Sequence, residues 1–365
     1  MAKWYTGLLM TLTMAFITAC GRATQPHPQT EAFRLPQVGV AQLAMTTPHQ
    51  GWVLTQSHTV LVMRNHTWHR VTPPEAPQSV NVRLGGISGR GAWVVYSSGN
   101  PTSTVTLEAT SDAGKTWRSH VVHVPEPATL EQIDVVSSTA GYLVFALPGG
   151  SMGAFGEEIL VTDDGGQQWA VLPAPPIIGA WLSFLTANRG WATGGQTGAG
   201  GVPIGTAMLD ETVDGGRHWT RQLIPLPAQA RSMELTVHPP HFWSSTGGYF
   251  WIIGSSPTQP ETLVLVYRTT DGGRQWELAA TRFWPQGALV AAVSAYGPES
   301  WIQYQNDGAN HLEAFWHHQW HKLTFPGHNV MSMRFINAHM GWAVGGYGTA
   351  WITMNGGERW KQNSR

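Results

Sequence analysis

The chain has 365 residues, which is enough for one large domain with a substantial hydrophobic core. Only 12% of the residues are charged, and 21 basic residues nearly cancel 22 acidic ones, so the composition gives no basic surface for nucleic acid. The 42 glycines, 24 prolines and 19 tryptophans favour an all-β fold of many short strands over a helical one.

The N-terminal segment is typical of an export signal. One lysine precedes an apolar run from Trp4 to Thr18, which is short for a membrane span of about 20 residues but suits a secretory signal. The run ends in Ile17-Thr18-Ala19-Cys20, which resembles a bacterial lipobox. This resemblance implies that residues 1–19 are a lipoprotein signal peptide and that Cys20 carries the lipid. A signal cleaved without lipid attachment and an uncleaved anchor stay open as alternatives.

Residues 20–32 are polar and contain prolines, which favours a flexible tether. We therefore expect an extracytoplasmic protein that is anchored to the cell membrane through the lipid on Cys20. Because Cys20 is the single cysteine, the chain has no disulfide, redox pair or thiolate metal site.

An eight-residue motif with an Asp-Gly core recurs along the rest of the chain, and we call each copy a box turn. The five copies are TSDAGKTW, TDDGGQQW, TVDGGRHW, TTDGGRQW and TMNGGERW, which end at Trp117, Trp169, Trp219, Trp276 and Trp360. Two further stretches, which end at Trp68 and Trp320, keep the β-rich lead and the tryptophan but lack the Asp-Gly core.

A second sequence marker recurs once in each repeat, in step with the box turns. It is a glycine-aromatic or similar pair that opens a short apolar run: Gly51-Trp52, Ala92-Trp93, Gly141-Tyr142, Gly190-Trp191, Gly248-Tyr249, Ser300-Trp301 and Gly341-Trp342. Each repeat divides into four strands, as in EQIDVVSS, GYLVFAL, EEILVT and WAVLPAP. Seven repeats of this kind predict a seven-bladed β-propeller of four-stranded antiparallel blades over residues 33–365.

The box turns are interpreted as structural fasteners. Asp and Thr side chains cap backbone groups in tight turns, Gly tolerates positive φ, and Trp buries a large apolar surface. Copies on separate hairpins cannot converge on one substrate, whereas catalytic groups must lie within hydrogen-bond reach of each other. The residues assigned to this role are Asp112, Gly114, Trp117, Asp164, Gly166, Trp169, Asp214, Gly216, Trp219, Asp271, Gly273, Trp276, Asn355, Gly357 and Trp360.

The pattern [ST]-x-D-x-G-x-x-W resembles the Asp-box, or bacterial neuraminidase repeat. The predicted seven repeats and the paired signature GWAVGGYGTAWITMNGGERW are similar to the photosystem II stability and assembly factor family. That resemblance implies an extracytoplasmic, non-enzymatic propeller that binds membrane-protein intermediates, but not a photosynthetic role. The family's partner-binding face is rich in arginine, whereas here only Arg231 and Arg282 fall in candidate loops of that kind.

The chain also offers features that point toward an enzyme. Phe33-Arg34-Leu35-Pro36 resembles the FRIP motif of sialidases, but it equally suits an outer strand that closes the ring beside Trp360. No accompanying arginine pair and Tyr-Glu pair emerge, so no catalytic residue is assigned. The histidines His311, His317, His318 and His321 suit exposed positions on a degenerate box turn, and His238 and His241 are read as loop residues. We therefore expect no metal and no cofactor.

A binding face is expected where the loops between second and third strands are long and glycine-rich, at residues 148–157, 193–207 and 254–261. The candidate residues there and nearby are Phe155, Glu157, Gln196, Pro203 and Arg231. The favoured function is a monomeric, membrane-tethered scaffold or assembly factor that binds a protein partner in the envelope. The alternative is a carbohydrate-active protein, either a sialidase-like glycosidase or a glycan binder. An enzyme should gather carboxylates or an arginine triad in one axial pocket, whereas a docking scaffold should expose aromatic side chains.

Overall fold

The computed structural model describes residues 38–362, apart from residues 65–66, 74–80, 149–155, 178–179, 195–203, 256–261, 285–287 and 307. The chain divides into two compact units, Met1–Ala32 and Phe33–Arg365, and the described residues belong to the second. The expected signal peptide, the tether with Cys20 and the Phe33-Arg34-Leu35-Pro36 segment lie outside the described residues. Within the described part, no helix has the length and apolar character needed to cross a membrane.

Five sheets have a four-stranded path in which each strand pairs antiparallel with the next. The first contains β1 (Val40–Thr47), β2 (Gln50–Thr55), β3 (Val60–Arg64) and β4 (Thr67–Arg70). The next contains β12 (Trp181–Phe184), β13 (Gly190–Gly194), β14 (Met208–Thr212) and β15 (Thr220–Arg221). A 3₁₀ helix, η3 (Ala228–Ser232), then leads to the sheet of β16 (Glu234–Val237), β17 (His241–Phe242), β18 (Gly248–Ser255), β19 (Thr262–Thr269) and β20 (Glu277–Trp284), in which β16 and β17 both pair with β18.

The last two of these sheets follow β20 in the sequence. One contains β21 (Leu289–Tyr296), β22 (Glu299–Asn306), β23 (Ala309–Trp316) and β24 (Gln319–Leu323). The other contains β25 (Val330–Phe335), β26 (Gly341–Gly345), β27 (Ala350–Thr353) and β28 (Lys361–Gln362). A second 3₁₀ helix, η4 (Gly346–Gly348), joins β26 to β27.

The remaining strands form one seven-stranded sheet, which covers the second and third sequence repeats. It contains β5 (Asn81–Gly86), β6 (Ala92–Ser97), β7 (Thr102–Thr110), β8 (Arg118–Val135), β9 (Gly141–Ala146), β10 (Glu157–Thr162) and β11 (Ala170–Leu172). The all-β propeller with four-stranded antiparallel blades is confirmed, but the prediction of seven separate blades is wrong. Five separate blades accompany this larger sheet, because β8 pairs with β7 up to Ala128 and with β9 from Thr129 onward without a break.

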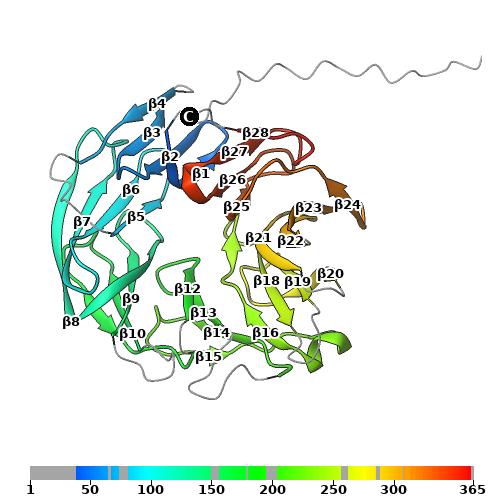
Figure 1. Ribbon diagram of the computed structural model, residues 1–365. Coiled ribbons are helices and arrows are strands. Elements are labelled where there is room, and N and C mark those ends of the chain that lie inside the picture. The colour runs from blue at the N-terminus through cyan, green and yellow to red at the C-terminus, as the bar shows by residue number, and fades with distance from the viewer. Residues whose placement is uncertain are drawn as a thin grey trace, which may run out of the picture. The chain divides into compact units, whose positions relative to one another are not determined.

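Figure 1 shows β1, β5, β12, β21 and β25, each the first strand of a repeat, around the centre of the propeller. Side chains of these inner strands bond the backbone of the next inner strand. Gln42 of β1 accepts from the Leu84 amide of β5 at 2.8 Å, and Ser294 of β21 accepts from the Phe335 amide of β25 at 2.9 Å. The first and last sheets meet through a buried cluster that includes Met45 and Trp342, which closes the ring by packing.

The second strand of each repeat is almost fully buried. In β2, β6 and β13, nearly every residue has its side chain covered, including Trp52, Trp93 and Trp191, which are 0–1% exposed. A strand in the middle of a sheet that has neighbouring sheets on both faces buries both sets of alternating side chains. This burial explains why the second sequence marker is a continuous apolar run rather than an alternating one.

All five box turns have the same hydrogen bonds. The threonine hydroxyl donates to the Asp or Asn Oδ1 at 2.8–3.0 Å. It also accepts from the amide of the glycine two residues after the Asp or Asn, at 2.8–3.1 Å. The amide before the tryptophan donates to the same Oδ1 at 3.0 Å in every copy. The amide of the residue directly after the Asp or Asn donates to a carbonyl in the loop between the first two strands of the same repeat, at 2.7–2.8 Å. Each turn is therefore held together by its own side chains and is bonded to the loop between the first two strands of its repeat.

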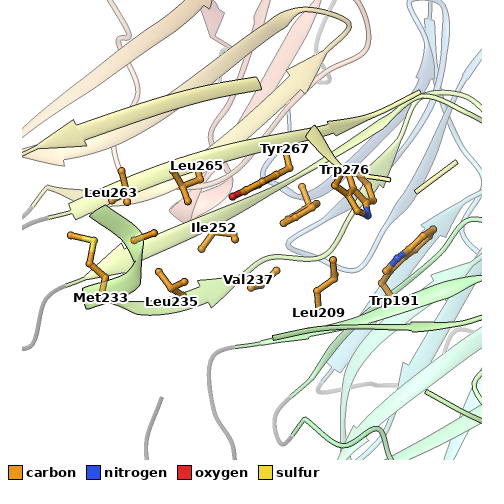
Figure 2. Close-up of a cluster of buried hydrophobic side chains, with 12 residues drawn as sticks. Trp191, Leu209, Met233, Leu235, Val237, Ile252, Leu263, Leu265, Tyr267 and Trp276 are labelled. Atoms are coloured by element: carbon orange, nitrogen blue, oxygen red, sulfur yellow. The ribbon is translucent and has the colours of Figure 1, made fainter. Parts of the chain in front are cut away.

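The two sequence markers contact each other between neighbouring repeats. The Trp117 ring packs edge-on against Trp52 with centroids 6.4 Å apart, and Trp169 packs in the same way against Trp93 at 6.3 Å. Figure 2 shows one such cluster, in which Trp276 of one sheet faces Trp191 of the preceding sheet, with centroids 6.1 Å apart. The shared phase of the two markers therefore reflects a repeated contact between neighbouring repeats.

The box-turn carboxylates give the fold an acid-sensitive component. Hydrogen bonds from the Thr116 amide and hydroxyl hold the pKa of Asp112 well below its ordinary value. A carboxylate with a lowered pKa in the folded state stabilises the protein above about pH 4, and this stabilisation is lost as the pH falls further. Asn355 accepts the equivalent amide bond in its own turn. We expect Asp112→Asn to fold at neutral pH and to lose less stability than the wild type between pH 5 and pH 2, measured by urea unfolding. An equal loss of stability between pH 5 and pH 2 in both proteins would contradict this role of Asp112.

Candidate functional site

A pocket of about 370 Å³ lies among the inner strands, and we call it the axial pocket. Its wall is formed by residues of β1, β17, β18, β21, β25 and β26 and of the link between β16 and β17. They are Leu43, His238, His241, Tyr249, Trp251, Ile253, Val290, Ala291, Ala292, Val293, Met331, Ser332, Met333, Arg334 and Trp342. Because these strands belong to four different sheets, only the closed propeller assembles the pocket.

Stacked aromatic rings run along this wall and continue beyond it. Trp181 of β12 stacks on His238 with ring centroids 5.1 Å apart, and His238 stacks on Trp251 at 4.8 Å. The His241 ring also stacks on Trp251, at 5.6 Å, and lies 5.5 Å from the Tyr249 ring. We call Trp181, His238, Trp251, His241 and Tyr249 the aromatic run. Its ring-to-ring contacts connect β12 to β18, where Tyr249 is buried.

The Pro239-Pro240 pair explains how two histidines reach this row. Proline cannot donate to a strand ladder, so the pair interrupts the inner strand between β16 and β17. On either side of the interruption, the His238 amide donates to the Trp251 carbonyl at 2.9 Å and His241 pairs with Tyr249. Both imidazoles thus lie beside Trp251 on the neighbouring strand.

The axial pocket is weakly charged. Arg334 is the one residue with a permanent charge in its described wall, and no carboxylate lines that wall. Burial lowers the pKa of His238 to about 4, and burial together with the positive charge of Arg334 lowers the pKa of His241 to about 3. Both imidazoles are therefore neutral at pH 7. The pocket offers apolar and aromatic surface, neutral ring nitrogens and one guanidinium.

A second pocket, of about 400 Å³, lies beside the first, and we call it the Glu157 pocket. Its wall consists of Glu131, Gln132, Val144, Ala146, Glu157, Ala180, Trp181 and Pro239. Burial raises the pKa of Glu157 to about 8, and a hydrogen bond from the Ala180 backbone opposes this shift only in part. Trp181 is 42% exposed, so a large part of this residue is open to solvent.

Of the candidate face residues, Glu157 and Arg231 are described, whereas Phe155, Gln196 and Pro203 lie outside the described residues. Glu157 is the first residue of β10 and lines the pocket named after it. Arg231 is exposed in η3 and lines neither of the two pockets.

Two further sequence interpretations are wrong. Arg282 lies on β20 rather than in a loop, and its guanidinium forms an ion pair with Glu313. His241 is the first residue of β17 rather than a loop residue, whereas His238 does lie in the link before that strand. In the sequence, the aromatic run is marked by a proline pair between two histidines, at the place of a repeat's inner strand. Among the described residues, no group of three or more potential ligands is arranged to hold a metal ion.

Comparison with known proteins identifies one sequence relative. The photosystem II assembly lipoprotein Ycf48 of Synechococcus sp. (strain CC9902) is 24% identical over 254 residues, which cover 55% of this chain and 67% of that protein. The chain is homologous to Ycf48. No protein-family model matches the sequence.

Solved structures agree with this relationship at the level of the fold. The structure of Ycf48 bound to a D1 peptide superposes with a TM-score of 0.56 and 14% identity, over 89% of this chain and 95% of that one. A GH74 xyloglucanase from Xanthomonas campestris gives a TM-score of 0.53 and 13% identity, over 89% of this chain and 53% of the enzyme. At such identities these superpositions establish a shared β-propeller fold, while the homology to Ycf48 rests on the sequence.

Proposed function

We propose that this chain is a protein-binding β-propeller that acts as an assembly factor for a membrane protein complex, and that it binds a segment of its partner at the axial pocket. Two comparisons support the proposal: its homologue Ycf48 is a photosystem II assembly lipoprotein, and Ycf48 has been solved with a D1 peptide bound. The observation that carries it here is the composition of the axial pocket, which combines aromatic and apolar walls with one arginine and has no carboxylate in its described lining.

This composition is typical of surfaces that bind proteins. Aromatic residues, methionine and arginine are enriched at interface centres, and the aromatic rings bury a large area at a small cost in side-chain entropy. Glycoside hydrolysis instead uses a pair of carboxylates that flank the bond to be broken. The axial pocket favours binding of a protein segment over sugar hydrolysis.

The proposed location is the outer side of the membrane, with the propeller held there by the lipid on Cys20 and the tether of residues 20–32. A tether of this length keeps the axial pocket close to membrane-protein partners, which raises their effective concentration. We expect Cys20→Ala to move the protein from the membrane fraction to the soluble fraction without changing its thermal unfolding. Retention of the variant in the membrane fraction would contradict lipid anchoring.

Site-specific crosslinking tests the proposed binding site. A photoreactive amino acid at Ser332, an exposed pocket residue, should crosslink to one segment of one membrane protein in intact cells. The same group at Leu223, which is 89% exposed and outside the pocket, is the control and should not give that product. Mass spectrometry of the crosslinked peptides identifies the segment. Equal products from both positions, or none from Ser332, would contradict binding at the axial pocket.

Two exposed residues of the pocket permit a test with little risk to folding. Met331 is 74% exposed and Arg334 is also exposed, so Met331→Ala and Arg334→Gln should leave thermal unfolding unchanged. Together they should weaken binding, and with it the Ser332 crosslink, at least about thirtyfold, since two central interface residues at about 1 kcal/mol or more each contribute about 2 kcal/mol or more. Leu223→Ala is the matched surface control and should leave the crosslink intact.

A further inference from the structure

The aromatic run connects the two pockets. Trp181 lines the Glu157 pocket, His238 lines the axial pocket, and their rings stack on each other. Pro239, the next residue after His238, also lines the Glu157 pocket. A chain segment that lies along the aromatic run therefore passes both pockets, and a side chain that leaves it near Trp181 enters the Glu157 pocket.

The walls of the Glu157 pocket suit a long side chain with a cationic end. Val144, Ala146, Ala180 and Pro239 provide an apolar bed for a methylene stem. Trp181 is partly exposed and lines this pocket, and an indole ring is a good partner for a cation. No lysine or arginine lies among its described lining residues.

The polar groups of this pocket are acidic. Glu131 and Glu157 bring two carboxyl groups to the wall, from β8 and β10. The third polar residue, Gln132, is already occupied: its Oε1 accepts from the Leu182 amide at 3.1 Å, and its amide group donates to the Leu182 carbonyl. The polar groups left for a ligand are therefore the two carboxyl groups. That of Glu157 already accepts one bond from the Ala180 backbone, and that of Glu131 interacts with the charge of Arg83.

We propose that the Glu157 pocket receives a lysine or arginine side chain of the same protein segment that occupies the axial pocket. This inference rests on the proposed function and adds a chemical requirement for the partner. Arg334 offers a positive charge at the axial pocket, and the glutamates offer carboxyl groups beyond Trp181, so the two pockets select opposite charges in a bound segment. A segment with an acidic or neutral group at Arg334 and a basic residue at Glu157 binds in one direction only.

Protonation of Glu157 couples this binding to pH. In the free protein burial raises the pKa of Glu157 to about 8, so the carboxyl is mostly protonated at pH 7. A cation in the pocket favours the ionised form, and binding then releases a proton. Affinity for the cation therefore rises from pH 6 to about pH 8, by at most tenfold per pH unit, and levels off above that.

The other titratable groups around Glu157 are few. Glu131 faces the same pocket from β8 and interacts with the charge of Arg83 on β5. His238 stacks on Trp181 from the link after β16. Glu158 follows Glu157 on β10, where successive side chains point to opposite faces. Burial raises the pKa of Glu158 and lowers that of His238 to about 4, so His238 stays neutral across the range from pH 6 to pH 8.

Small amides of single amino acids test the pocket on the whole folded chain. N-acetyl-arginine amide and N-acetyl-lysine amide are the probes, and N-acetyl-norleucine amide is their neutral counterpart. Binding is followed by NMR through the indole resonance of Trp181. We expect the basic probes to bind at least about tenfold more tightly than norleucine at pH 8.5, and to weaken at pH 6. Equal binding of norleucine, or affinity independent of pH, would overturn the proposal.

Matched variants separate this inference from the proposed function. Glu157→Gln should weaken the arginine probe about tenfold and abolish its pH dependence, whereas Arg334→Gln should leave the probe unaffected. A failure of the probe while the Ser332 crosslink persists would overturn the Glu157 assignment alone. Probe binding without any Ser332 crosslink would overturn the proposed function, and with it the claim that the side chain belongs to a partner. Preferential binding of a neutral oligosaccharide such as maltotetraose would overturn the basic side chain as the occupant.

Discussion

Gly166→Ala is expected to cost about 3 kcal/mol of folding stability, one of the two largest effects we predict. Gly166 has φ +90°, and a Cβ atom there would lie 2.1 Å from Cδ2 of Leu107. Leu107 is 0% exposed within a packed cluster, so it cannot move away without disturbing its neighbours. The left-handed conformation costs about 1–2 kcal/mol for a residue with a Cβ, and overpacking adds about 1–3 kcal/mol. Urea unfolding at neutral pH measures the sum.

The neighbouring glycine provides the control. Gly165 has φ +81°, but a Cβ atom there would meet only the Ser138 carbonyl oxygen, at 3.5 Å. The equivalent position of the first box turn is Ala113, with φ +63°, so the fold already accepts a Cβ in this place. Gly165→Ala should therefore cost only about 1 kcal/mol. Equal losses for the two variants would show that the close approach to Leu107 does not contribute.

The strands were predictable where the sequence pattern reflects burial from both sides. In the third repeat, EEILVT coincides with β10 and GYLVFAL differs from β9 by one residue. These segments are apolar because each is covered by neighbouring sheets, and that environment repeats with every turn of the chain around the axis. The apolar segments therefore recur along the sequence with the same period as the contacts between neighbouring sheets.

The number of separate blades was not predictable from that period. Two prolines, Pro125 and Pro127, suggest a break between the second and third repeats, yet both lie inside β8. They fall where the register with β7 shifts, between His123 and Ala128, so their missing amides remove no regular ladder bond there. The strand continues through them and joins two repeats into one sheet.

The candidate site was predictable only in part. Glu157 belongs to a long loop and strand that the sequence marks as unusual, and it does line a pocket. The axial pocket is different, because its residues come from positions as distant as Leu43 and Trp342 and share no local motif. Closure of the ring brings them together. A single sequence shows the repeats but not which inner side chains meet at the axis.

Arg282→Met is expected to destabilise the fold by about 3 kcal/mol. Glu313 is 1% exposed, and Arg282 contacts both of its oxygens, with Nε 2.5 Å from Oε2 and Nη2 3.1 Å from Oε1. Tyr304 adds a third bond, from its hydroxyl to Oε1 at 2.9 Å. Loss of the guanidinium leaves a buried carboxylate without its counter-charge, and breaking a buried pair in this way costs about 3–5 kcal/mol.

Removal of the Glu313 charge is expected to cost less folding stability than removal of the Arg282 charge, because Arg282 is more accessible to solvent than Glu313. The Arg282 side chain is 31% exposed and also lies over the rings of Trp284 and Trp320, at 5.5 and 6.0 Å. When Glu313→Gln removes the negative charge, the guanidinium retains water and these aromatic contacts, and the new amide can still accept from Tyr304. We expect a loss of about 1 kcal/mol, the size of one hydrogen bond. The double variant should be more stable than Arg282→Met alone, because it no longer buries a charge. If urea unfolding gives the reverse order, the penalty lies in the packing of the Arg282 stem against the two tryptophans rather than in the buried charge.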